Sequence, residues 1–456
     1  MKTIKIYLAI ASLFLMGISK TMADNHIWTG TVNNNWTLAA NWGGTAPVAN
    51  DDITIPGGLT NYPVITTNIP AVHNLLINST GIGAYLTVNT GGALNVTGTV
   101  TINSNGTLNL TNGASTINSI ACAGSLFVYG GTLIFTYNID INSGGTFLQS
   151  GGSISDVGTN PNNHFHINTG GTGSQTGGTI YVRDFRIRTG AGFTQDETSG
   201  TSLIKISHDY SCVGTGSFVS TAGTVEWTGE DNAGAASDID GINSFFNVLL
   251  SGNNKLFAGN SGTLSVAGNW TNNNTSNDPY IIDHTSTIIF NGLGNQIIGG
   301  TNITNFNDLI LNKTGGNVTL NQDITITGNA TFTNGIMNSN STNSINFLDN
   351  ATVSGGSNTS YVNGPVIKTG NDAFIFPLGK DGKYAPAGIS TPGNKYDIFT
   401  AEYFKTPYSD LSVTGALKKV SNVEYWEIAR TSGTSAVNVS LYFAPIRFST
   451  VSIFKT

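Results

Sequence analysis

The residues best suited to chemistry lie in one short stretch, Tyr181–Arg188, which reads Tyr-Val-Arg-Asp-Phe-Arg-Ile-Arg. Alternate side chains of a strand share a face, so Asp184, Arg186 and Arg188 are expected on one side and Arg183 on the other. Polysaccharide lyases and hydrolases gather carboxylates with Arg, Lys or His on one outer face of a sheet. The stretch is therefore the best candidate for a carbohydrate-active site.

Hydrolysis of a glycosidic bond usually needs two carboxylates that flank that bond. The Arg-rich stretch supplies only Asp184, and the next acidic residues, Asp196 and Glu197, are distant. The favoured interpretation is therefore a solvated strand that carries an ion pair, and an enzyme is the alternative.

Metal-binding residues form no recognisable set. His164 and His166 would share a strand face, but a metal site needs a third and a fourth ligand, and none follows at a recognisable spacing. Asp51 and Asp52 could hold Ca²⁺, although loop acids usually meet water or cap backbone amides. The sequence has no Gly-x-Ser-x-Gly elbow, phosphate loop or paired-cysteine zinc spacing. We therefore assign no catalytic, cofactor-binding or metal-binding residue, and expect no cofactor.

Composition limits the partners. Charged residues make up 10% of the 456 residues, against about 25% in a typical soluble domain. The net charge is −7 without a basic cluster, so we expect neither nucleic acid nor anionic membranes as partners. Abundant Val, Ile and Thr with 57 Gly favour a folded β-protein whose polar surface consists of Asn, Thr and Ser.

The N-terminus has the layout of a secretory signal peptide. Lys2 and Lys5 precede the uncharged run Ile6–Ile18, and Thr21-Met22-Ala23 offers small residues for cleavage. The run is shorter than the roughly 20 apolar residues that span a bilayer. We predict a signal peptide over residues 1–23, cleavage near Ala23, and a secreted or cell-surface mature chain without a membrane span.

Short apolar-polar-apolar triplets, separated by Gly, Asn or Ser, fill the middle of the chain. Gly92–Thr97 recurs as Gly106–Thr111, and the alternation is typical of half-buried strands. A coiled coil is disfavoured because Gly costs about 1 kcal/mol per residue in a helix. Three beats of seven residues make a coil of about 21 residues, and stacked coils form a repeat architecture.

The fold class predicted for residues 71–360 is thus all-β, a right-handed parallel β-helix or solenoid. Leu, Val, Ile and Phe should point inward, and Thr and Asn outward. A set of β-sandwich domains is the alternative. Thr224–Gly229 also matches Thr287–Gly292, and Leu264–Asn269 matches Ile324–Asn329, 60 residues later. Sixty residues are about three coils, which predicts a duplicated block.

The ends of the chain differ from the repeat. Residues 24–70 contain Trp28, Trp36 and Trp42, and solenoids need capped ends, so we predict an N-terminal cap. Residues 361–456 carry more aromatic and charged residues and should form a smaller, sandwich-like β-module.

Two cysteines, Cys122 and Cys212, are about four coils apart. At about 4.8 Å per coil this is near 19 Å, whereas a disulfide needs Cα atoms within about 7 Å. We therefore predict free, buried thiols.

Both ends resemble large secreted surface proteins of Bacteroidetes-type bacteria. The resemblance rests on these segments: Trp28-Thr-Gly30, Trp36, Asn41-Trp42, Asp51-Asp52, Asn61-Tyr-Pro-Val-Ile65, Phe374–Gly379 and Val420-Ser-x-x-Glu-Tyr-Trp426. It implies an adhesin-like protein with no catalytic motif to carry over. Such proteins usually continue into a C-terminal sorting domain, whereas this chain ends at Thr456, which implies an incomplete final module.

Together these features predict a non-catalytic, structural or adhesin-like repeat protein that contacts glycans or other surface polymers. Outer rows such as Thr99-Val-Thr101 and Thr325-Ile-Thr327 are candidate glycan contacts, although Thr is also an ordinary exposed strand residue. The alternative is a carbohydrate-active β-helix enzyme, a polysaccharide lyase or hydrolase. The sequence indicates no oligomeric state.

Overall fold

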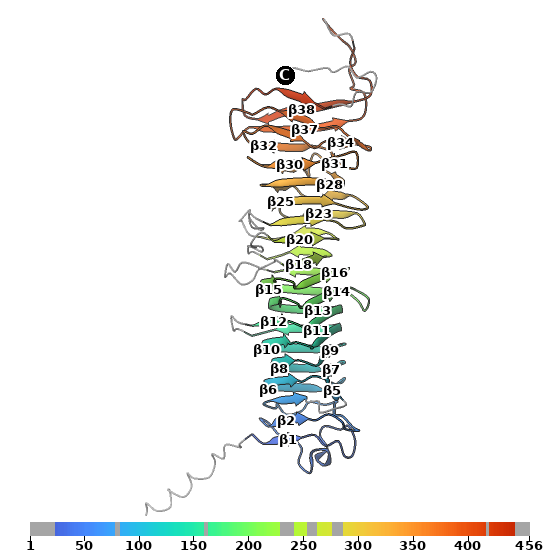
Figure 1. Cartoon of the computed structure of the whole chain (residues 1–456), viewed down its shortest axis with the longest axis vertical. Helices are drawn as coiled ribbons and strands as arrows, with labels where there is room; N and C mark the ends of the chain where they lie inside the picture. The colour runs from blue at the N-terminus through green and yellow to red at the C-terminus, as the bar shows by residue number, and fades with distance from the viewer. Residues whose placement is uncertain are drawn as a thin grey trace, which may run out of the picture.

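The chain folds into a long rod of short stacked strands (Figure 1). The structure is a computed structural model that describes residues 23–77, 83–158, 163–228, 241–252, 262–275, 286–415 and 419–442. It confirms the predicted all-β class and the parallel β-solenoid, which has about 13 turns. The predicted signal peptide, except for Ala23, lies outside the described residues. No helix among the described residues is long and apolar enough to cross a membrane.

Each coil contributes three short strand segments, and successive coils pair in register as three parallel ladders. The ladder that we call face one starts with β1 (Asn25–Ile27), β2 (Asp52–Ile55) and β4 (Leu75–Ile77). It continues through β12 and the C-terminal parts of five longer strands: β6 (Ala93–Ile102), β8 (Ala114–Cys122), β10 (Thr132–Ile141), β12 (His164–Ile167), β13 (Thr172–Ile187) and β15 (Ser202–Cys212).

Faces two and three complete each coil. Face two consists of the first parts of β6, β8 and β10, the last part of β11 (Thr146–Asp156), inner segments of β13 and β15, and then β17 (Thr224–Trp227) and β19 (Asn247–Leu250). Face three includes these strands: β5 (Ala84–Val88), β7 (Gly106–Leu110), β9 (Ser125–Val128), β14 (Gly192–Gln195), β16 (Ser217–Ser220), β18 (Ile242–Phe245), β20 (Thr263–Val266), β22 (Thr287–Phe290) and β25 (Asp308–Asn312).

Inward side chains from all three faces form one continuous core. Phe165 and Phe185 stack edge to face at 5.5 Å, and Phe185 meets Phe193 at 5.0 Å. Burial of each such ring contributes about 1.5–3 kcal/mol relative to exposure. The expected apolar interior has an exception, because Gln149, Gln175 and Gln195 are buried in one column and hydrogen-bond to one another.

Glycine marks corners where one coil lies directly on the next. Gly131 has a φ of 71°, and a Cβ there would lie 2.0 Å from the carbonyl oxygen of Gly113. Any side chain at this position would therefore both strain the backbone and separate the coils.

The 60-residue match does not correspond to whole coils, so that prediction is wrong. Thr224–Trp227 lies on face two, whereas its match Thr287–Phe290 lies on face three. Short alternating strands have the same local pattern on every face. Coil length varies with the corner loops, so matching segments drift from one face to another.

The stack extends into both terminal segments. At the N-terminus, β1 already pairs in parallel with β2, while Trp28 and Trp36 both pack edge to face on Trp42. Near the C-terminus, β32 (Val366–Thr369) pairs in parallel with β29 (Ile345–Phe347). It then pairs antiparallel with β37 (Ile398–Phe404), which pairs with β38 (Tyr425–Ser432). The C-terminal module thus continues a sheet of the rod.

Both cysteines are free and buried, as predicted. They occupy one inward column of face one, in which the register runs from Cys122 through Ile141, Ile167 and Ile187 to Cys212. Four coil steps therefore separate the two sulfur atoms.

Candidate functional site on face one

Outward side chains of face one form two rows along the rod. The row nearer the start of each strand, which we call the polar row, is polar at every step from β1 to β15. Its members are Asn25, Asp52, Asn74, Thr99, Ser119, Asn138, His164, Asp184 and Asp209. The adjacent row consists of Ile27, Thr54, Leu76, Thr101, Ala121, Asp140, His166, Arg186 and Ser211.

The polar row also joins the coils. Asp52 Oδ1 accepts the backbone N–H of Asn74 at 3.1 Å, and Asn74 Oδ1 accepts that of Thr99 at 2.9 Å. Face three offers a contrast, because its outward row includes Phe127 and Leu148. A row without apolar interruption is thus a property of face one and not of every face.

A shallow groove lies over the first coils of face one. Polar and adjacent rows both line it, including Asn25, Thr54, Asn74, Thr99 and Thr101. Amide and hydroxyl groups both donate and accept hydrogen bonds, and so does every hydroxyl group of a sugar. The structure therefore places the predicted contacts Thr99 and Thr101 in a groove whose chemistry suits a neutral, hydroxylated ligand.

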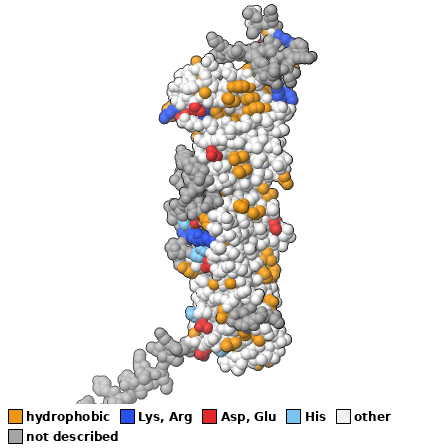
Figure 2. Space-filling view, viewed as in Figure 1, with side chains coloured by type: hydrophobic (Ala, Val, Ile, Leu, Met, Phe, Trp, Pro, Cys, Tyr) orange, Lys and Arg blue, Asp and Glu red, His pale blue; other side chains and the backbone are white. Residues whose placement is uncertain are grey.

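Charged side chains gather further along the same face. Figure 2 shows basic and histidine side chains at about mid-height of a largely uncharged rod. We define the charged cluster as the following eight residues: Asp140, His164, His166, Arg183, Asp184, Arg186, His208 and Asp209. They come from four successive coils on β10, β12, β13 and β15.

Asp184 is the centre of the charged cluster. Its carboxylate accepts hydrogen bonds from Arg186 Nη2 at 2.7 Å and from the backbone N–H of Asp209 at 3.2 Å, and it pairs with His208 Nδ1 at 2.7 Å. Arg183 Nη1 lies 3.4 Å away. The side chain is only 2% exposed, so Asp184 organises its neighbours and has little surface left for a ligand.

The prediction that Arg183 lies on the opposite face from Asp184 is wrong. The register of β13 against β15 shifts between Val182 and Asp184, where the strand turns from face two to face one. Alternation is interrupted at this bend, so Arg183 and Arg186 both reach the same carboxylate.

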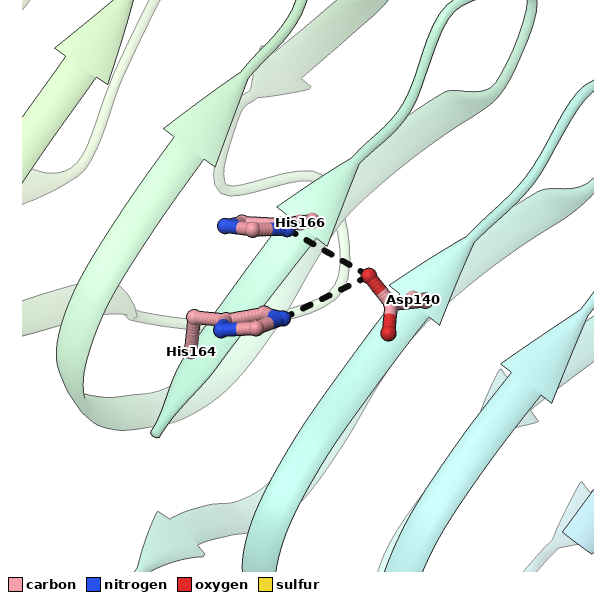
Figure 3. Close-up of side chains that lie close together, drawn as sticks. All are labelled: Asp140, His164 and His166. Carbon is pink, nitrogen blue, oxygen red and sulfur yellow. Dashed lines mark ion pairs between the residues drawn. The ribbon is translucent and has the colours of Figure 1, made fainter. Parts of the chain in front are cut away.

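His164 and His166 meet a third group, Asp140, from the preceding coil (Figure 3). His164 Nε2 and His166 Nδ1 lie 3.5 Å and 3.3 Å from the same oxygen, Asp140 Oδ1. The two rings stack with their centroids 3.5 Å apart. We call these three residues the His–Asp triad.

Electrostatics in the triad favour an ionised carboxylate. Burial alone would raise the pKa of Asp140, but hydrogen bonds and charge from His164 and His166 outweigh it and hold that pKa well below its usual range. Burial lowers the pKa of His166, although Asp140 acts in the opposite direction. Its Nε2 is buried and has no hydrogen-bond partner among the described residues.

The other acidic candidates are not brought to this cluster. Asp196 and Glu197 lie in the turn after β14, where they accept N–H groups of Thr198 and Ser202. Asp51 and Asp52 are separated by their partners: Asp51 accepts the N–H of Val48 and pairs with His26, whereas Asp52 pairs with His73. The expected pairing of these two acids around one Ca²⁺ ion therefore has no support in their geometry.

Sequence reasoning missed Asp140, His208 and Asp209 as members of the cluster. Each is one coil from its partner, at separations of 20 to 26 residues that follow no fixed period. The inward residues carry the usable signal: aligning Ile139 with Phe165, Phe185 and Tyr210 brings the outward charges into register.

The comparisons with known proteins cover part of this face. Residues 27–130 match a family described as a domain of unknown function, DUF8693. No curated protein and no solved structure matches the chain. Over its first coils, including the groove residues Thr54 to Thr101, the chain is therefore similar to a domain whose function is not known.

Proposed function

We propose that this chain is a non-catalytic, secreted or cell-surface protein of adhesin-like type that contacts glycans or other surface polymers along face one. The observation that carries the proposal is the polar row, which continues without an apolar residue from Asn25 to Asp209. Eight steps of about 4.8 Å make it about 38 Å long. A straight polar strip of this length suits an extended polymer better than a compact small molecule.

The environment of the carboxylates supports a binding role over a catalytic one. Asp184 is enclosed by Arg183, Arg186 and His208, and Asp209 pairs with Arg186 Nε at 3.3 Å. A general acid or base must reach the proton that it transfers. Carboxylates held in this way stabilise the coils and leave the uncharged groove as the accessible part of the face.

Export rests on the sequence. The signal-peptide layout of residues 1–23 and the resemblance to secreted surface proteins of Bacteroidetes-type bacteria both point outside the cell. N-terminal sequencing of the protein recovered from culture medium or from the cell surface should begin at Asp24. Recovery of a chain that still begins at Met1 would contradict export by this route.

A glycan array probed with the mature chain tests the binding role. We expect binding to a subset of glycans, and loss of that binding in a double variant of the groove, Thr99→Lys with Thr101→Lys. The matched control places the same substitutions on face two, at the outward residues Asn95 and Thr116. Equal loss in both double variants would refute a role for face one.

A second candidate function, a carbohydrate-active enzyme, has one observation in its favour. The structure adds Asp209 and His208 to the Arg-rich strand, so the single carboxylate expected there is in fact one of two on adjacent coils. Incubation with acidic polysaccharides, followed by absorbance of unsaturated uronate products, distinguishes the two roles. Product formation that is lost in Arg186→Ala would establish the enzyme and displace the binding proposal.

A further inference from the structure

We propose that the His–Asp triad of Asp140, His164 and His166 is a binding site for a divalent transition-metal ion of the Zn²⁺ class. One ligand atom from each residue lies within 4.8 Å of the other two. Two imidazoles with one carboxylate form a ligand set that suits Zn²⁺ and neighbouring first-row metals. This inference goes beyond the proposed adhesin-like function and does not depend on it.

The spacing of the ligand atoms fits a tetrahedral ion. Bonds of about 2.1 Å to a central ion put tetrahedral ligands about 3.4 Å apart. The measured separations from Asp140 Oδ1 are 3.5 Å to His164 Nε2 and 3.3 Å to His166 Nδ1. The rings stack with an interplanar angle of 13°, so their lone pairs run nearly parallel. Convergence on one ion requires the rings to tilt, and the outer ring of His164 has 16% of its side chain exposed.

The strand geometry explains why these groups converge. His164 and His166 are two residues apart on β12, so both point outward, and Asp140 lies directly opposite His166 on β10. The triad is reached from solvent through Asp140, whose side chain is 26% exposed. Water can therefore complete the coordination, which leaves an open position as in catalytic rather than structural zinc sites.

Ordinary hydrogen bonding does not account for the triad. Buried polar atoms nearly always have a partner, yet His166 Nε2 has none among the described residues. Elsewhere on the rod each acid meets a single histidine, as in the His73–Asp52 and His26–Asp51 pairs. Only in the triad, among the described groups, do two imidazoles converge on one carboxylate oxygen.

Nearby positive charge does not prevent binding of a cation. Arg186, which lies beside His166 in the next coil, already pairs with Asp184 at 2.7 Å and with Asp209 at 3.3 Å. Its charge is therefore compensated within the charged cluster.

The test is titration of the chelator-treated mature chain with Zn²⁺ by calorimetry and with Co²⁺ by visible absorption. We expect saturable binding of Zn²⁺, and ligand-field bands of Co²⁺ that Zn²⁺ abolishes. His164→Gln, His166→Gln and Asp140→Asn should each weaken binding by more than about tenfold. Ca²⁺, which takes only oxygen ligands, should not displace Co²⁺.

Two variants in the same chain serve as matched controls. His73→Gln removes an exposed His–Asp pair, and His26→Gln removes the histidine of a second group of potential ligands, Asp24, His26 and Asp51. Both should bind Zn²⁺ like the wild type, because both oxygens of Asp51 already accept backbone N–H groups.

Thermal unfolding separates loss of the site from loss of the fold. Zn²⁺ should raise the Tm of the wild type and of His73→Gln, and leave that of His164→Gln unchanged. Absence of saturable Zn²⁺ binding by the wild type would overturn the proposal. Binding that survives in His164→Gln but is lost in His26→Gln would overturn it as well.

Discussion

Replacement of Asp184 by Ala is the sharpest test of how the charged cluster is held together. The carboxylate accepts hydrogen bonds from Arg186, His208 and the backbone of Asp209, and its side chain is only 2% exposed. The polar row supplies a matched control in Asp52, which bonds to His73 and to the backbone of Asn74 in the same manner. Its side chain is 42% exposed, so the two residues differ chiefly in burial.

Burial sets the expected magnitudes. Removal of one partner of a buried ion pair costs about 3–5 kcal/mol, because the remaining charge is left without compensation. Asp184→Ala strands Arg186 and the N–H of Asp209, so we expect a loss in that range. Exposed pairs contribute about 0–1 kcal/mol, and Asp52→Ala should therefore cost about 1 kcal/mol or less.

Urea unfolding followed by tryptophan fluorescence measures both losses. Trp227 reports on the region, since its ring lies 6.0 Å from that of Tyr210, the residue after Asp209. Stacked repeats can unfold in parts, so the comparison uses the transition nearest the mutated coil. Equal losses for Asp184→Ala and Asp52→Ala would refute the reasoning, and so would a loss below about 1 kcal/mol for Asp184→Ala.

Three further outcomes follow from buried groups. Gln175→Leu should cost about 2–4 kcal/mol in urea unfolding, despite its similar volume, because Gln149 and Gln195 both lose their partner; a neutral effect would contradict a role for the glutamine column. Neither thiol should react with a disulfide reagent in the folded chain, since burial raises the pKa of Cys122 to about 12, and two thiols should react in denaturant; none in denaturant would reveal a disulfide. Hydrogen bonds from Ser435 and Thr434 hold the pKa of Asp397 below its usual range. Its contribution is therefore present above the unfolded pKa of about 3.9 and lost as pH falls through the lower folded value. Hydrogen exchange of β38 should rise on acidification in the wild type and change less in Asp397→Asn.

The sequence was sufficient to predict the solenoid because its signals are local. Alternation within a triplet such as Leu94-Asn-Val96 and a glycine at the next corner are both read within a few residues. The spacing of Cys122 and Cys212 was also predicted correctly, since four coil steps separate them. Local rules failed where the chain turns a corner, as between Val182 and Asp184, where Arg183 lies beside the acid from which alternation would separate it.

The candidate site could be predicted only in part because it is built across coils. His166 lies 26 residues from Asp140 and 20 from Arg186, so no single period connects the triad to the charged cluster. The lengths of the corner loops set these separations, and the loops carry no alternating pattern. The same variation explains why the 60-residue match falls on different faces.

The most direct test of the central claim, that face one is the binding surface, is hydroxyl-radical footprinting with and without a bound glycan. The account predicts protection of outward residues on face one, such as Leu76 and His164. Tyr85 and Tyr129, which are exposed away from that face, should stay equally reactive. Protection of Tyr85 and Tyr129 with Leu76 and His164 unchanged would contradict it.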